Sequence, residues 1–526
     1  MSTPAVNNAP APAKATQDFR SQIGHISRQS GSYFAGTLFT TGLGYVFKIY
    51  VARVLGPEDL GIYALGVTLI GFLGIFNTLG LAQSAVRFVA SYKAGGKYRE
   101  LHALIWQGAG LLVIANVIVA VLLLTFGRLA AVRFYHTPAL VPYLPLFALM
   151  MLLAIISSFY GKVLAGYRDI KVRTWIVNFI GSPLNMLLAV VLISIGFGLR
   201  GYITAQIVGS FLVCIMLLIA VRRFTPAAAR LSAQPFSSPP KEVWQFSAAM
   251  LGIGLLEFLV SQVDKVALGF YLGAKAVGVY SVAAALVVYV PLVLSSINQI
   301  FAPTIADLHT RGEMALLNRL FQSLTKWAFG MTLPLATVVI VFAHPLMRIF
   351  GPGFENGWPI LVIGTGGQLV NCGVGSVGYL LLMSGHEKQL IKVQASMAIL
   401  MVVASFVLVP VMGVVGAAVA AAVTNVGMNI LNLFVVKKTL GISPYNRGYL
   451  RLILPTGAML AAVIVLNRFS FAFVHDWLAV AVTLVAAYCV FIAIALGTSL
   501  DSDDRLIATA VWSRIRGTFI HSGASA

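Results

Sequence analysis

Four charged side chains lie inside apolar stretches that are long enough to cross a membrane. Lys48 lies in one stretch, and Glu257, Asp264 and Lys265 lie together in another. A charge at the bilayer centre costs about 2.5–3.5 kcal/mol on insertion scales, so each such residue is expected to face a partner or a water-filled cavity. These residues therefore predict polar partners or a water-filled cavity in the membrane-spanning part of the chain.

Helical spacing indicates which of these side chains share a face. Glu257 and Asp264 are seven residues apart, so they lie two turns apart on one face. Lys265 is one residue further round and need not pair with Asp264 directly. Lys48 has Thr41 two turns below it. In the alternative interpretation both lysines extend from the outer ends of their spans to the membrane interface.

Weaker polar signals occur in other apolar stretches. Gln368 and Asn371 lie near Gly364–Gly367 in the tenth expected span. We expect them to contribute to the cavity, and interhelical hydrogen bonding is the alternative. The three cysteines have no zinc or disulfide spacing, and no metal ligands or enzyme motif stand out.

A stretch of 16 residues around the lysines occurs twice, at 48–63 and 265–280. Each copy begins with lysine, has Leu-Gly seven residues on, and ends with apolar-Gly-apolar-Tyr, at a constant offset of 217. A second pair of matches has offsets of 221 and 215. These repeats predict two copies of a six-span unit, each opening with a helix–turn–helix, and they make Lys48 and Lys265 equivalent.

The composition predicts the fold class. The chain is 59% hydrophobic and 10% charged, whereas a soluble domain carries roughly 25% charged residues. Apolar runs of membrane-spanning length recur along it, so we expect an all-α, polytopic membrane protein with about 14 transmembrane helices. The net charge of +20 is attributed to the positive-inside bias of membrane proteins and not to nucleic-acid binding.

The basic residues also predict an orientation. If the N-terminus is cytoplasmic, 27 of the 36 lysines and arginines lie on the cytoplasmic side, seven lie outside and two lie within spans. This bias predicts that both termini are cytoplasmic. The expected segments are a cytoplasmic tail (1–32), a first six-helix lobe (33–222), a cytoplasmic linker (223–243), a second lobe (244–438), helices 13 and 14 (439–499) and a cytoplasmic tail (500–526).

These features resemble a known family. Twelve-plus-two spans in duplicated lobes resemble the MOP exporter superfamily, with its MATE-like fold. The pattern from Asp264-Lys265 through Leu272-Gly273 to Val277-Gly278-Val279-Tyr280 resembles its polysaccharide transporter branch. Those proteins are Wzx-type flippases for oligosaccharides linked to undecaprenyl pyrophosphate. The resemblance implies alternating access in the inner or plasma membrane and cell-surface polysaccharide biosynthesis as the role.

The resemblance also implies roles for the charged residues. Lys48 and Lys265 would bind the anionic head group, as point charges suited to phosphate. Glu257 and Asp264 would couple transport to H⁺ or Na⁺, or hold the lysines charged. No other cofactor is expected. The expected partners are the lipid-linked oligosaccharide, membrane lipids, and polysaccharide polymerase or export machinery.

Three other functions remain open. A lipid II flippase of the same superfamily would share the fold, and its cavity is usually more cationic. A multidrug or cation antiporter would favour an acidic cavity, whereas this chain offers both signs. A membrane glycosyltransferase or polymerase would need a sizeable outer loop or an acidic or histidine cluster, and neither is evident.

Overall fold

The computed structural model describes residues 12–167, 170–231, 239–470 and 476–498, and within these ranges every regular element is helical. This confirms the expected all-α fold class. The side chains of residues 1–41, and so that of Thr41, lie outside the described part, as does the expected C-terminal tail after Thr498.

The first half of the chain contains the elements that correspond to the first six expected spans. Helix α1 begins at Pro12, about twenty residues before the first expected span. The elements in order are α1 (Pro12–Asn77), α2 (Leu81–Ala94), α3 (Tyr98–His102), η1 (Ala103–Gln107), α4 (Gly108–Leu129), η2 (Ala130–Phe134), η3 (Pro138–Tyr143), α5 (Leu144–Gly166), α6 (Ile170–Thr174), η4 (Trp175–Gly181), α7 (Ser182–Leu192), η5 (Ile193–Phe197), α8 (Gly198–Phe224) and α9 (Ala227–Leu231).

The second half follows the same order and ends in two additional helices. Its elements are α10 (Lys241–Val287), α11 (Leu292–Thr310), α12 (Met314–Val341), α13 (Ala343–Arg348), η6 (Glu355–Gly357), α14 (Trp358–Val374), α15 (Val377–Met383), α16 (Glu387–Met412), α17 (Val414–Leu440), η7 (Arg447–Leu452), α18 (Ile453–Ser470) and α19 (Asp476–Thr498).

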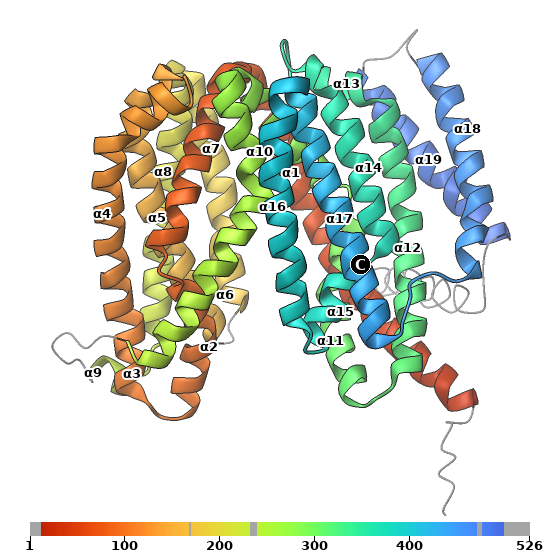
Figure 1. Ribbon diagram of the computed structural model, residues 1–526, viewed down its shortest axis with the longest axis horizontal. Coiled ribbons are helices and arrows are strands. Elements are labelled where there is room, and N and C mark those ends of the chain that lie inside the picture. The colour runs from red at the N-terminus through yellow and green to blue at the C-terminus, as the bar shows by residue number, and fades with distance from the viewer. Residues whose placement is uncertain (1–11, 168–169, 232–238, 471–475, 499–526) are drawn as a thin grey trace, which may run out of the picture.

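Two glycines divide the longest helices into hairpins. A straight helix of 66 residues, the length of α1, would be about 99 Å long, and the hydrocarbon of a bilayer is about 30 Å thick. Gly56 in α1 and Gly273 in α10 have φ values of 76° and 75°, which glycine adopts without steric cost. Both helices turn at these residues, at the end of the molecule uppermost in Figure 1, which we call the hairpin end.

The number of crossing segments agrees with the sequence. Among the described residues, ten helices are long and apolar enough to cross a membrane, or eleven if the bent pair α14–α15 is one span. Three of the ten contain glycine breaks, at Gly56, at Gly196–Gly198 and at Gly273. If each of these three helices is counted as two spans, the number of spans rises from eleven to fourteen. Each half of the chain therefore begins with one of the two duplicated hairpins, as expected.

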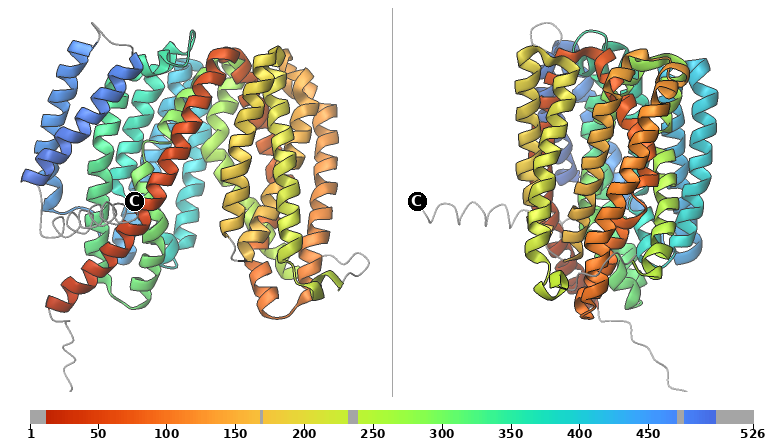
Figure 2. Two further views of the ribbon diagram at one scale, coloured as in Figure 1. Left: turned by 180° about the vertical axis from the view of Figure 1, so that it is seen from behind. Right: turned by 90° about the vertical axis from the view of Figure 1, so that its left-hand side faces the viewer.

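The two halves exchange their first helices. Helix α1 packs mainly against α10. Away from the hairpin end, α1 leans toward α11 and α12, while α10 leans toward α2, as Figures 1 and 2 show. Because α2 and α11 are equivalent in the repeat, the exchange is reciprocal. The vertex where α1 and α10 meet is where Lys48 and Lys265 lie.

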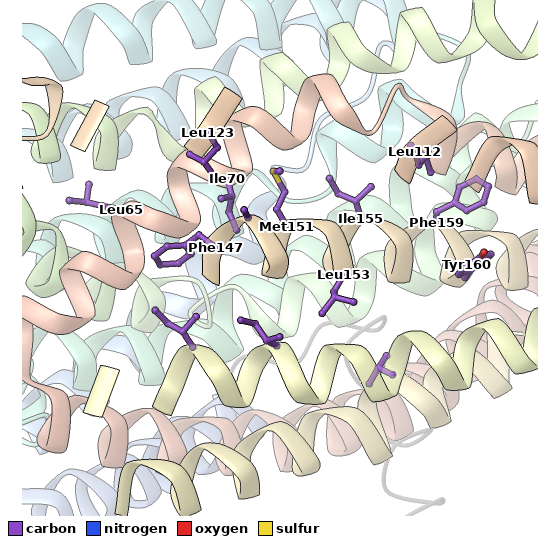
Figure 3. Packing of buried hydrophobic residues seen from close by; sticks show 14 of the residues in the cluster. Leu65, Ile70, Leu112, Leu123, Phe147, Met151, Leu153, Ile155, Phe159 and Tyr160 are labelled. Carbon is purple, nitrogen blue, oxygen red and sulfur yellow. The ribbon is translucent and has the colours of Figure 1, made fainter. Parts of the chain in front are cut away.

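Buried side chains hold this arrangement in three main clusters. The largest joins the first half to α10 and includes Leu65, Phe147 and Phe159, each fully buried (Figure 3). The C-terminal pair α18 and α19 packs on α12 through a separate cluster around Val338 and Phe491. That pair therefore lies beside the duplicated unit and contributes nothing to the cavity described next.

Candidate functional site

One cavity of about 630 Å³ lies where the duplicated hairpins meet. Its wall comes from α1, α8, α10, α14 and α17, so both halves of the chain contribute. Most of the wall is apolar. Its polar side chains are Lys48, Tyr63, Thr68, Tyr202, Ser261, Gln262, Asp264, Lys265, Tyr280, Ser281 and Gln368. We call this space the central cavity.

The two repeat-equivalent lysines enter the central cavity from opposite copies. The Lys265 Nζ donates a hydrogen bond to Gln262 Oε1 at 2.7 Å. In the described part of the chain, the Lys48 ammonium has no hydrogen bond, and neither lysine belongs to an ion pair. Both ammonium groups enter the same cavity, so their like charges repel one another across one space. An anion placed between them would relieve this repulsion and pair with both charges.

Asp264 is held differently from the lysines. Its side chain is only 6% exposed. The Tyr280 hydroxyl donates to Asp264 Oδ2 at 2.5 Å, and the backbone N–H of Lys265 donates to Oδ1 at 2.8 Å. A buried carboxylate needs such donors. Asp264 therefore stays in the cavity wall, and each of its two carboxylate oxygens accepts one hydrogen bond. Its negative charge lies on one side of the two lysines.

The Tyr280 hydroxyl should contribute measurably to stability. We expect Tyr280→Phe to lower the free energy of unfolding by about 1–3 kcal/mol, because Asp264 then loses a donor inside an apolar wall. Equilibrium unfolding in mixed micelles measures this change. Tyr271→Phe is the matched control, since Tyr271 is 41% exposed. In the double variant with Asp264→Asn, the two losses should not add; an additive result would contradict the coupling.

The first copy lacks an acidic residue at this place. At the offset of 217, Asp264 corresponds to Phe47 and Tyr280 to Tyr63. Tyr63 packs edge-on against Tyr202, with ring centroids 4.8 Å apart, and Phe47 contacts the same Tyr202 at 6.4 Å. Among the described residues, the wall of the central cavity therefore has two lysines and one carboxylate, and that carboxylate belongs to the second copy.

The other expected site residues fall into three groups. Gln368 lines the central cavity, and Asn371 Nδ2 donates to its Oε1 at 2.9 Å, one turn away on α14. Glu257 is not part of the cavity wall: its side chain is exposed on α10, two turns from Asp264. The seven-residue spacing puts Glu257 and Asp264 on one face of α10, yet only Asp264 lies in the cavity wall. The side chain of Thr41 lies outside the described residues.

Backbone contacts join the two hairpins beside the central cavity, at its hairpin end. A Cβ on Gly61 would overlap the carbonyl oxygen of Ala274, and a Cβ on Gly278 would overlap that of Pro57. The two contacts are related by the repeat, since 57 and 274 differ by the same 217 as 61 and 278. Arg53 adds a hydrogen bond of 2.8 Å from Nε to the carbonyl oxygen of Ile349.

Sequence reasoning missed the tyrosines of the site. The repeat places Tyr63 and Tyr280 only at the end of a predicted helix–turn–helix, whereas in the structure both line the central cavity and Tyr280 holds Asp264. The signal was available, because Asp264 and Tyr280 lie nine and seven residues on either side of Gly273. A turn at that glycine brings them to the same level of the hairpin. Gln262, three residues before Lys265, was likewise within helical reach.

Relatives in sequence are transport proteins. The family model described as polysaccharide biosynthesis protein matches residues 26–309. The succinoglycan biosynthesis transport protein ExoT of Rhizobium meliloti is 26% identical over 64% of this chain, and the match spans 65% of ExoT, less than two thirds. A putative O-antigen transporter of Shigella flexneri is 35% identical over 78 residues, 15% of this chain and 18% of that one.

Solved structures establish the fold. The lipid II flippase MurJ, in an inward closed conformation, superposes with a TM-score of 0.70 over 88% of this chain and 98% of its own, at 14% identity. An inward-facing MATE family transporter of the MOP superfamily gives 0.62 over 76% and 94%, at 15% identity. Identities this low show a shared fold alone. The chain has the MOP fold, and because the family model covers more than half of its length, it belongs to the polysaccharide biosynthesis protein family.

Proposed function

We propose that this protein is a flippase that moves a lipid-linked oligosaccharide from the cytoplasmic to the outer leaflet for cell-surface polysaccharide biosynthesis. The observation that carries the proposal is the pair of equivalent lysines facing one cavity, at the place where the two hairpins pack backbone to backbone. The membership in the polysaccharide biosynthesis family and the similarity to ExoT support the substrate class.

The chemistry of the central cavity fits a pyrophosphate linked to undecaprenol or a similar lipid. Two ammonium groups outside any ion pair in the described part of the chain, beside one carboxylate that Tyr280 holds, match a dianionic head group. The lipid tail would stay in the bilayer while the head group passes through the cavity by alternating access. In the described part of the chain, the cavity wall has one carboxylate and no histidine or cysteine, which favours a transporter over a glycosyltransferase or polymerase.

The same proposal includes location and coupling. The charge bias supports cytoplasmic termini, and the proposed role supports the inner or plasma membrane, so the hairpin end would face outward. Asp264 is the candidate for H⁺ or Na⁺ coupling, because it is the acidic residue in the cavity wall. Membrane lipids and the polysaccharide polymerase or export machinery are the partners that this role requires.

A flip assay in liposomes tests the proposal. The full chain is reconstituted with a fluorescent undecaprenyl-pyrophosphate oligosaccharide, and protection from an impermeant quencher is followed with and without H⁺ or Na⁺ gradients. We expect protein-dependent movement of this lipid, faster with the coupling gradient. Parallel vesicles contain fluorescent lipid II or take up a cationic dye. Movement of either probe without movement of the oligosaccharide lipid would assign the chain to one of those two substrate classes instead.

A further inference from the structure

A second polar space lies within the first half of the chain, apart from the central cavity. It has a volume of about 310 Å³ and lies between α5, α6, η4, α7 and α8. Half of its lining residues have polar side chains, which is unusual inside a helical membrane bundle. We call this space the polar groove and define it by these six residues: Ser157, Ser158, Arg173, Ser182, Asn185 and Ser210.

The polar groove contains groups that lack partners. Arg173, partly buried on α6, makes no hydrogen bond or ion pair with any described residue. Its guanidinium packs over Gly161, where a Cβ would lie 3.2 Å from Nε. The Oδ1 of Asn185 is buried without a donor. The Asn185 oxygen lies against Gly209 of α8, where a Cβ would be 1.5 Å away, so it faces that helix and not the groove. The unpaired guanidinium is therefore the group that a polar ligand or water in the groove would satisfy.

The local backbone widens the groove at this level. The segment η4, from Trp175 to Gly181, is a π-helix, and both Val177 and Gly181 line the groove. Ser182 donates to the carbonyl oxygen of Val177 at 3.2 Å, across the wider turn. Short π-helical segments cost stability and occur frequently at functional sites. Here the wider turn separates α7 from α5 beside Arg173.

Helix α8 places the groove relative to the central cavity. Tyr202 lines the central cavity, and Ser210, Val213 and Leu217 line the groove. At 100° per residue, these three positions lie within about 80° of Tyr202, so both spaces lie on one side of α8. At 1.5 Å per residue they lie about 12 to 22 Å further from the hairpin end. The groove therefore lies on the side that we propose faces the cytoplasm.

We propose that the polar groove binds the glycan of the substrate and that Arg173 pairs with a carboxylate on one of its sugars. This inference rests on the proposed flippase function. With the pyrophosphate between Lys48 and Lys265, the attached sugars would extend toward the groove. Its serine hydroxyls and the Asn185 amide match sugar hydroxyls. The guanidinium has no acidic partner among the described residues, so an acidic sugar completes the site.

Binding of soluble oligosaccharides tests the groove without the lipid or the pyrophosphate. The full chain in nanodiscs of phosphatidylcholine is titrated calorimetrically with a uronic-acid tetrasaccharide and with the same tetrasaccharide after carboxyl reduction. We expect the acidic form to bind at least about tenfold more tightly, as for one charge-assisted hydrogen-bonded pair. Arg173→Gln should remove the difference, and Asn185→Asp, which adds a carboxylate to the groove, should do the same.

Control variants separate this inference from the proposed function. Arg200→Gln, which changes an exposed arginine on α8, and the Lys48→Ala/Lys265→Ala double variant should both keep the preference for the acidic form. Equal binding of the two forms, no binding of either, or an unchanged preference in Arg173→Gln would overturn the groove assignment and leave the flip assay untouched. Loss of the preference on adding phosphatidylglycerol would assign the groove to a phospholipid head group instead.

Discussion

Replacing both cavity lysines, as Lys48→Ala/Lys265→Ala, should reduce flipping of the oligosaccharide lipid by at least about a hundredfold. A hydrogen bond to a charged group contributes about 1.5–3 kcal/mol, and 1.4 kcal/mol corresponds to a factor of ten. Neither lysine belongs to an ion pair within the described residues, and Asp264 keeps its hydrogen bonds from Tyr280 and from the backbone N–H of residue 265 after the substitution. The flip rate at matched protein levels in liposomes measures the effect.

The lysine variant has a matched control in the same helix. Lys275 is exposed on α10, two residues beyond Gly273, and Lys275→Ala should leave flipping unchanged. Single variants should show intermediate losses, since each ammonium would pair with the same head group. Oligosaccharide flipping at the normal rate in the double variant, with normal expression, would show that the lysines extend to the interface and do not bind substrate.

The second large effect is expected at the hairpin contact. Gly278→Ala should force the hairpins apart, because the new Cβ would overlap the carbonyl oxygen of Pro57 in a region where backbone meets backbone. The central cavity should then open at the hairpin end. In a background without native cysteines, labelling of Ser281→Cys by an impermeant maleimide from that side should rise several-fold, since Ser281 lines the cavity.

Gly252→Ala is the control for this substitution. Gly252 lies on α10 as well, and a Cβ there would meet nothing within 4 Å, so alanine should leave labelling unchanged and stabilise the helix by about 0.5–1 kcal/mol. Gly61→Ala should reproduce the effect of Gly278→Ala from the other copy. If Gly61→Ala and Gly278→Ala are both labelled like the parent protein and unfold at the same temperature as it does, the hairpin contact does not close the cavity.

The sequence predicted the architecture well because its signals act locally. Long apolar runs require helices in a bilayer, and Leu-Gly at Gly56 and Gly273 marks turns that a β-carbon would strain. The repeat offset then placed Lys48 and Lys265 opposite one another without any knowledge of packing. The same offset also indicated that the two hairpins open equivalent halves.

The site was predicted less completely because it depends on how helices rotate against each other. Glu257 and Asp264 share a helical face by spacing, yet the contact of α10 with its neighbours buries one and exposes the other. The polar groove draws its side chains from four separate elements, and no periodic pattern in one stretch reveals such a convergence. From the sequence, Arg173 is only one of the 27 basic residues assigned to the cytoplasmic side.

The reciprocal contact of Gly61 and Gly278 has a consequence for how the two halves could diverge after duplication. A side chain acquired at either glycine meets the backbone of the other copy, so neither copy can change there independently. Positions such as 47 and 264 face a cavity and are free of this restriction, and there the copies carry phenylalanine and aspartate. Duplication thus preserves the joint between the halves while it leaves the binding surface open to specialisation.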